Sequence, residues 1–276
     1  MRIRISHATD YAYDRTARGI LQHLRLTPRP HEGQHVRSWR IECDADVRLT
    51  PGEDAYGNVL HVLQTEKPVD RLSIRVEGEV ETVESYGVVR GAIERLPPMV
   101  YLRDTALTQA DADIRQFAAD AVASVGSDPL ARMHALNQAI NREVRFDTDA
   151  THPNTSAQEA LRLKRGVCQD MAHLFLACAR TLGVPARYVS GHLMRPDRSD
   201  QEAGHAWAEA MVQDLGWVGF DPANGVSPTE SHVRVAIGLD YLAAAPVRGT
   251  VYGGGGERMS VRLRVADASA QSQSQA

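Results

Sequence analysis

The hydrophobic pattern of the chain changes period near residue 100, and this change constrains the fold more than any other feature. Before it, apolar and polar residues alternate over 1–7, 39–43 and 72–76. Alternation with a period of two is typical of strands that have one face in solvent. Turn-forming residues at 27–30 and 51–58 separate these segments. Residues 1–100 are therefore predicted to form an antiparallel β-sandwich-like domain.

After Pro97 and Pro98, apolar residues recur every three or four positions, which is the helical period. Three helix starts are predicted. Thr108 with Asp111 resembles a capping box, and a proline at the favourable first helical position follows Asp128. A second capping box spans 156–159 and opens a short helix ending near residue 164.

Strands are expected again over 185–193, 205–212 and 216–220, and a glycine-interrupted strand pair over 247–265. The chain is thus predicted to be α+β, with helices packed on a second antiparallel sheet. We divide it into an N-terminal β domain (1–100), a second domain (101–266) and a disordered tail (267–276) rich in Ser, Gln and Ala.

Composition excludes several classes of function. A chain of 276 residues with 43% hydrophobic residues can bury the cores of two domains. Its net charge of −4 gives no argument for binding nucleic acid or an anionic membrane. There is no apolar run of about 18 residues and no signal-peptide pattern, and three cysteines without C-x-x-C spacing favour a reducing compartment. We expect a cytoplasmic protein with no nucleic-acid or membrane partner; its oligomeric state is left open.

The strongest candidate for a catalytic segment is Gly-Val-Cys-Gln-Asp-Met-Ala-His at 166–173, which precedes an apolar helical stretch over 174–182. Cys168 would lie in the first turn of that helix, where free N–H groups and the helix dipole favour the thiolate. Downstream, His205 and Asp221 offer a base and an orienting carboxylate. Adjacent strands lie about 4.8 Å apart, so the expected strands can bring these three side chains together.

Each of these residues taken alone is more often structural than catalytic. Cys43 and Cys178 lie on apolar faces and are predicted to be core residues. Asp170 and His173 are predicted to brace the first helical turn. Trp207 would wall the site or fill the core, and the side chain of Gln169 is a candidate second oxyanion donor beside the N–H of Cys168.

Two other features of the sequence resemble binding sites only superficially. The glycine run at 253–256 lacks the lysine and hydroxyl residue of a phosphate loop and is expected to be a flexible turn near the site. The histidines before residue 62 lack the spacing of metal ligands. The sequence predicts no metal and no cofactor.

The segments 166–173, 183–191, 205–209 and 216–222 together resemble the bacterial transglutaminase-like family. The N-terminal strands, with Asp-Ala-Tyr-Gly-Asn at 54–58, resemble the β domain that precedes the core in one branch of that family. The resemblance implies a papain-like core over 101–266 with a Cys–His–Asp triad, and carries these roles onto Cys168, His205 and Asp221. One departure is His192, which stands where an aromatic residue is expected and leaves the shape of the substrate open.

The resemblance also implies acyl transfer through a cysteine thioester. The favoured hypothesis is a thiol hydrolase, either a cysteine peptidase or an amidase, that acts on a peptide or protein amide, because hydrolysis needs only water as acceptor. The alternatives are a protein-glutamine gamma-glutamyltransferase, which passes the acyl group to an amine, and a non-catalytic binding module that retains the fold.

Overall fold

The computed structural model describes residues 1–268, and its longest strand, β1 (Arg2–Leu24), organises the N-terminal sheet. The first half of β1 pairs with β5 (Val69–Thr82) and β15 (Glu257–Asp267), and the second half with β4 (Val59–Thr65) and β14 (Val247–Gly253). Next to these lie β2 (Gln34–Cys43), beside β5, and β3 (Val47–Glu53), beside β4. All of these pairs are antiparallel.

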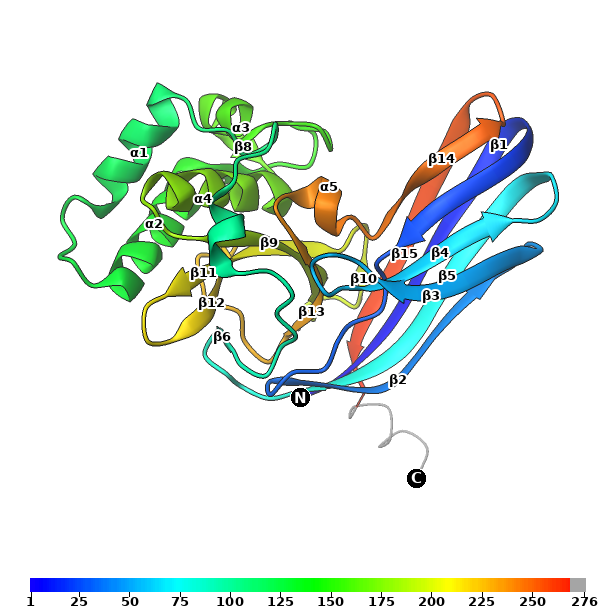
Figure 1. Cartoon of the computed structure of the whole chain (residues 1–276), viewed down its shortest axis with the longest axis horizontal. Helices are drawn as coiled ribbons and strands as arrows, with labels where there is room; N and C mark the ends of the chain where they lie inside the picture. Colours follow the sequence, from blue (N-terminus) through cyan, green and yellow to red (C-terminus); the bar gives the residue numbers. More distant parts are fainter. Residues whose placement is uncertain (269–276) are drawn as a thin grey trace.

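The register of β1 against β5 breaks between Ala12 and Ala17, and the sheet folds over there. The two layers enclose a core that includes Tyr11 and Leu72 from one half and Ile20 and Leu63 from the other. The sandwich is the strand-rich body on the right of Figure 1. The predicted β-sandwich-like domain is confirmed.

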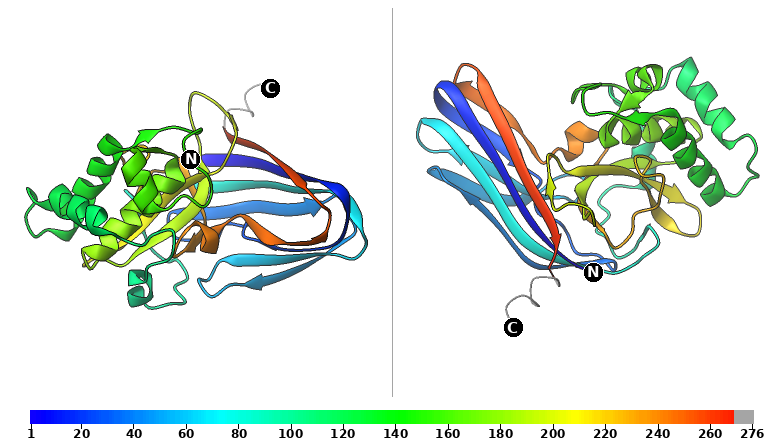
Figure 2. Two further views of the ribbon diagram at one scale, coloured as in Figure 1. Left: turned by 90° about the horizontal axis from the view of Figure 1, so that it is seen from above. Right: turned by 180° about the vertical axis from the view of Figure 1, so that it is seen from behind.

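The second sheet has the order β13-β9-β11-β12-β6 and is antiparallel throughout. Its strands are β6 (Val88–Val89), β9 (Ala186–Leu193), β11 (His205–Val212), β12 (Gly216–Phe220) and β13 (His232–Gly238). The expected bounds of β11 and β12 are confirmed. The central helix α4 (Cys168–Thr181) packs on β9 and β11. Around α4 lie α1 (Ala112–Val122), α2 (Pro129–Glu143) and α3 (Ala157–Leu163), as the two views of Figure 2 show.

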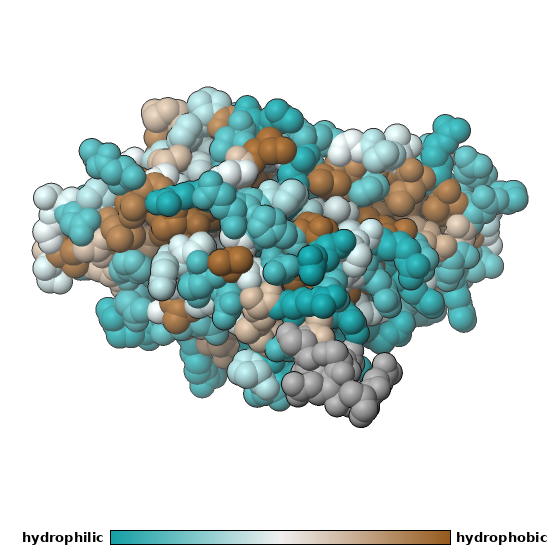
Figure 3. Space-filling view, turned by 90° about the horizontal axis from the view of Figure 1, so that it is seen from below, coloured by the Kyte–Doolittle hydropathy of each residue, from teal (hydrophilic) through white to brown (hydrophobic). Residues whose placement is uncertain are grey.

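Short elements complete the described part of the chain. They are η1 (Pro98–Leu102), β7 (Arg145–Phe146), β8 (Arg165–Gly166), β10 (Asp200–Gln201) and α5 (Tyr241–Ala244). None of the helices within residues 1–268 is long and apolar enough to cross a membrane. The face drawn in Figure 3 carries apolar patches interrupted by hydrophilic side chains.

The predicted domains 1–100 and 101–266 differ from the observed sheets in two places. Strand β6, before residue 100, pairs with β12 of the second sheet. Strands β14 and β15 belong to the N-terminal sheet, although the sequence placed residues up to 266 in the second domain. A period of two shows which side chains share a face, but it does not show which sheet a strand joins. Residue 267 ends β15, and 269–276 of the expected disordered tail lie outside the described residues.

The glycine run at 253–256 was also misplaced. It joins β14 to β15 at the end of the sandwich far from α4 (Figure 1). Its carbonyl groups at Gly254 and Gly256 accept hydrogen bonds from the backbone of Arg15 and Asp14. The expectation that it lies near the site is therefore wrong.

Helix starts were predicted well, with one exception. Asp128 caps α2 with Pro129 in the first turn, and the capping box at 156–159 opens α3. In α1, however, the N-cap is Asp111, which accepts a bond from the N–H of Ile114. Thr108 lies upstream, and its hydroxyl accepts a hydrogen bond from the buried guanidinium of Arg180 at 2.7 Å. A tertiary contact therefore explains that threonine better than a cap.

Two side chains of the sandwich add strand-like bonds to β13. Asn58 donates to the carbonyl of Ile237 and accepts from its N–H, both at 2.8 Å. Gln34 makes the same pair of bonds with the backbone of Arg234, again at 2.8 Å. The loop at 54–58 therefore contacts the second sheet, and these bonds fix how the sandwich meets it.

Candidate active site

The N-terminus of α4 is held in place by side chains from its own sequence motif. Cys168 is the first helical residue and is partly buried. Asp170 accepts hydrogen bonds from the N–H of Val167 at 2.8 Å and from the hydroxyl of Thr151 at 2.7 Å. His173 accepts one from the N–H of Tyr241 at 3.0 Å. The bracing roles expected for Asp170 and His173 agree with these contacts.

The other two candidate residues, Gln169 and Trp207, have partners of their own. The side-chain amide of Gln169 donates to the carbonyl of Pro153 at 3.0 Å. The indole of Trp207 is buried, with its ring centroid 6.1 Å from that of His205 and 5.4 Å from that of His232. A Cβ atom on Gly191 would lie 2.6 Å from the indole, so glycine is required there. Trp207 therefore packs against the rings of His205 and His232.

The structure brings the three residues of the predicted triad to one place. His205 begins β11, and Asp221 follows the last residue of the adjacent strand β12. The Nε2 atom of His205 lies 2.7 Å from Oδ2 of Asp221. Cys168 lies near the same imidazole and interacts with it strongly enough to raise the pKa of His205. One ring thus interacts with both the cysteine at the helix start and the carboxylate.

The charges at this site follow from these contacts. Burial alone would lower the pKa of His205, but hydrogen bonds to Asp221 and Cys168 outweigh it and raise the pKa to about 10. Burial alone would raise the pKa of Asp221, but hydrogen bonds from His205 and His232 outweigh it and hold the pKa well below its usual range. At neutral pH the pair is therefore an imidazolium and a carboxylate.

Two partners of Asp221 were missed by sequence reasoning. Asn224 donates from its side chain to Oδ2 at 2.6 Å, and the N–H groups of Ala223 and Asn224 donate to Oδ1 at 3.1 and 3.3 Å. The Nε2 atom of His232 lies 3.2 Å from Oδ2. Asn224 could have been found from the turn that begins at Asp221, but His232 comes from another strand and left no local signal.

His205, Asp221 and His232 also have the composition of a metal site, and one ligand atom of each lies within 4.8 Å of the others. Their observed contacts are hydrogen bonds, because both Nε2 atoms lie at hydrogen-bond distance from one carboxylate oxygen that also accepts from Asn224. The arrangement fits a hydrogen-bond network better than a metal-binding site.

A second buried charge cluster lies four residues further along β11. Glu209 accepts hydrogen bonds from Arg187 at 2.6 Å and from Arg234 at 2.7 Å, and Arg187 also pairs with Glu94. The guanidinium of Arg187 lies 3.8 Å from the ring centre of Trp217. Both Arg187 and Glu209 are fully buried.

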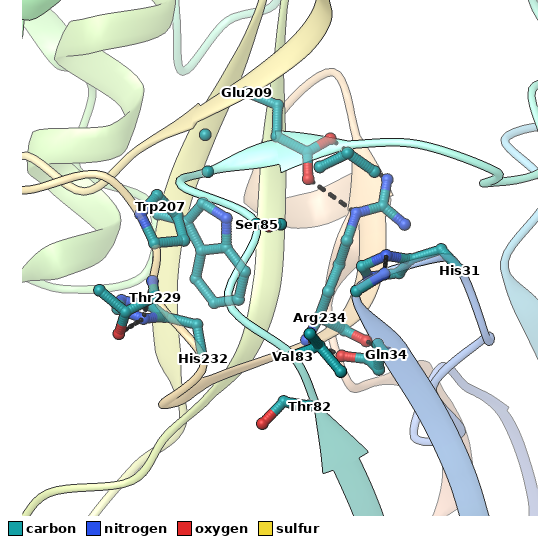
Figure 4. A pocket seen from close by; sticks show the side chains of 15 residues that line it. His31, Gln34, Thr82, Val83, Ser85, Trp207, Glu209, Thr229, His232 and Arg234 are labelled. Carbon is teal, nitrogen blue, oxygen red and sulfur yellow. Dashed lines mark hydrogen bonds and ion pairs between the residues drawn. The ribbon is translucent and has the colours of Figure 1, made fainter. Parts of the chain in front are cut away.

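A narrow cavity separates the second sheet from the sandwich beside these clusters (Figure 4). Trp207, Glu209, His232 and Arg234 line one side, and His31 and Gln34 from the sandwich line the other. Burial lowers the pKa of His31 to about 4.

Known proteins match nearly the whole chain. Residues 115–222 match the model of the Transglutaminase-like superfamily, and residues 3–81 match the Bacterial transglutaminase-like N-terminal region. An uncharacterized protein of Mycobacterium leprae is 31% identical over 284 residues, covering 96% of this chain and 98% of its own. One from Mycobacterium tuberculosis is 28% identical and covers 91% and 88%.

Among solved structures, a candidate cysteine protease from Cytophaga hutchinsonii superimposes with a TM-score of 0.78 at 20% identity. The match covers 97% of this chain and 91% of that one, and it shows a shared fold. With both family regions in order and a relative matched end to end, this chain belongs to the transglutaminase-like superfamily and carries that family's bacterial N-terminal region.

Proposed function

We propose that this protein is a thiol hydrolase, a cysteine peptidase or amidase, that cleaves a peptide or protein amide through a thioester on Cys168. The observation that carries the proposal is the imidazole of His205, which is hydrogen-bonded to Asp221 at 2.7 Å and interacts with Cys168 strongly enough to raise its own pKa. A nucleophile, a base and an orienting acceptor in this order are the parts that thiol acyl transfer needs.

The first half of the reaction uses the Cys168 thiolate and the His205 imidazolium. The Cys168 thiolate attacks the amide carbonyl carbon and a C–S bond forms, while the carbonyl π electrons move to the oxygen. The backbone N–H of Cys168, unpaired at the helix start, is a donor for that oxyanion. As the C–N bond breaks, the His205 imidazolium gives its proton to the leaving amine, which departs neutral.

The second half returns the enzyme to its starting state. Neutral His205 takes a proton from water, and the hydroxide equivalent adds to the thioester carbon. Collapse of this intermediate breaks the C–S bond and releases the carboxylic acid and the thiolate. Asp221 stays ionised and keeps the ring oriented throughout.

A screen of acyl donors, with and without a primary amine and with products read by mass, tests the proposal. We expect the free acid to be the main product in both arms, and no product with Cys168→Ala. Cys43→Ala, which changes a thiol in the sandwich, is the matched control and should behave like wild type. A conjugate to the amine as main product would point to the transferase instead. Equal yields from wild type and Cys168→Ala would rule out Cys168 as the nucleophile, and no product from wild type with any donor would leave the binding module.

A further inference from the structure

His232 touches the proposed catalytic carboxylate, although it lies 11 residues from it along the chain and starts a different strand. It is the first residue of β13 and is buried. Its Nε2 atom lies 3.2 Å from Oδ2 of Asp221, and its ring packs edge-on against Trp207 with centroids 5.4 Å apart. Contacts on two sides therefore hold the ring in one place.

The preceding turn determines which ring nitrogen carries the proton. The backbone N–H of Thr229 donates to Nδ1 of His232 at 3.0 Å, and the N–H of His232 donates back to the carbonyl of Thr229 at 3.0 Å. A nitrogen that accepts a hydrogen bond bears no proton, so the proton of the neutral ring must be on Nε2. That N–H points at Asp221, whose carboxylate can only accept.

We propose that His232 is a positioning residue that donates from Nε2 to Asp221 and thereby keeps Oδ2 directed at His205. The inference rests on the proposed role of Cys168, His205 and Asp221. Oδ2 receives His205, His232 and Asn224, while Oδ1 receives two backbone N–H groups. A carboxylate with both oxygens engaged in this way has little freedom to turn away from His205.

The sandwich helps to position His232. His232 and Thr229 line the narrow cavity whose opposite wall includes His31 and Gln34 of the sandwich (Figure 4). Gln34 donates a hydrogen bond to the carbonyl of Arg234, two residues beyond His232, and accepts one from the N–H of Arg234. The N-terminal sheet thus fixes the start of β13, and through it the donor that holds Asp221.

The test compares His232→Leu, which removes the donor, with His232→Gln, whose amide can still reach Asp221. The readout is the rate of Cys168 alkylation by iodoacetamide at pH 6.5, followed by mass spectrometry. One lost hydrogen bond to a charged group should slow His232→Leu about tenfold, with His232→Gln within about threefold of wild type. In an Asp221→Ala background, His232→Leu should change the rate less than about twofold, because its target is gone.

His31→Leu is the matched control, since His31 lines the same cavity without contacting Asp221, and its alkylation rate should equal that of wild type. The inference fails if Cys168 is alkylated as fast in His232→Leu as in wild type. It also fails if His232→Leu slows alkylation by the same factor with and without Asp221. Ring nitrogen NMR of the wild-type protein is independent of variant folding: it should show His232 neutral with its proton on Nε2. A proton on Nδ1 would overturn the inference.

Alkylation needs no substrate, so the two proposals fail separately. Coupling of His232 to Cys168 without turnover of any acyl donor would refute only the hydrolase. Turnover that does not respond to His232→Leu would refute only the positioning role.

Discussion

The second sheet contains two buried carboxylates that look alike in position but differ in their partners. Asp221 follows β12 and accepts from two histidines, and Glu209 on β11 accepts from two arginines. His205, Trp207 and Glu209 alternate along β11 and so share one face of the sheet. The same strand therefore supplies a member to each cluster.

The difference lies in what the partners can do with a proton. A guanidinium stays protonated under all physiological conditions, so the Glu209 cluster can brace the fold but cannot transfer a proton. An imidazole can gain and lose one, so the Asp221 cluster can do both. Burial and pairing alone do not distinguish a cluster that can only brace the fold from one that can also move a proton; the acidity of the partners does.

The largest effect should come from the sulfur at the Asp221 cluster. Cys168→Ala should lower turnover by about 10⁴-fold or more, because the nucleophile is gone. The thermal midpoint should stay close to that of wild type, since the side chain is small and partly exposed. Turnover and calorimetry on the same preparation check this, and residual activity within tenfold of wild type would contradict it.

Removing the charge of Asp221 should have the next largest effect. Asp221→Asn keeps the shape but loses the anion that stabilises the His205 imidazolium, so turnover should fall by about 10²- to 10³-fold. The loss should be smaller than that of Cys168→Ala or His205→Ala. Steady-state kinetics of the three variants rank them, and wild-type activity in Asp221→Asn would remove that residue from the mechanism.

The corresponding change in the other cluster should affect stability instead. Glu209→Leu leaves the guanidinium groups of Arg187 and Arg234 without their shared partner, which should cost about 3–5 kcal/mol of unfolding free energy. Activity per folded molecule should stay within about threefold of wild type. Denaturant unfolding measures the first quantity and active-site titration the second. A large loss of activity without loss of stability would show that the comparison is wrong.

Acid should weaken the fold through groups outside the proposed site. Burial is the main cause that lowers the pKa of His192 to about 3 and that of His7 to about 4, and the two rings lie 6.1 Å apart. Unfolding restores a pKa near 6.5, so the unfolded chain binds more protons between pH 6.5 and 4 and stability falls as pH falls.

This is the smallest of the expected effects. Each histidine should contribute a slope of about 1.4 kcal/mol per pH unit in that range. His192→Leu should remove one such contribution. Urea unfolding at pH 4.5, 5.5 and 6.5 measures it, and equal slopes in wild type and His192→Leu would contradict it.

Local patterns predicted the parts of the molecule that local forces determine. The bounds of β11 and β12, the start of α4 at Cys168 and the caps at Asp128 and Ser156 all follow from periodicity and capping chemistry. The same patterns could not assign β14 and β15 to the first sheet, because alternation does not name a partner strand.

Local patterns also predicted only part of the candidate site. His205 and Asp221 were found because motifs flank them, and the structure brings them within 2.7 Å. His232 was missed because its role depends on a turn at Thr229 and on the pairing of β13 with β9. Thr108 was misread because its partner, Arg180, lies 72 residues away.

The most direct test of the central claim, that His205 activates Cys168, is the rate of Cys168 alkylation by iodoacetamide at pH 6.5 in wild type, His205→Ala and Cys43→Ala. We expect His205→Ala to be at least about tenfold slower than wild type, because the cysteine loses the base that activates it. Cys43→Ala should react at Cys168 as fast as wild type. An unchanged rate in His205→Ala would contradict the account.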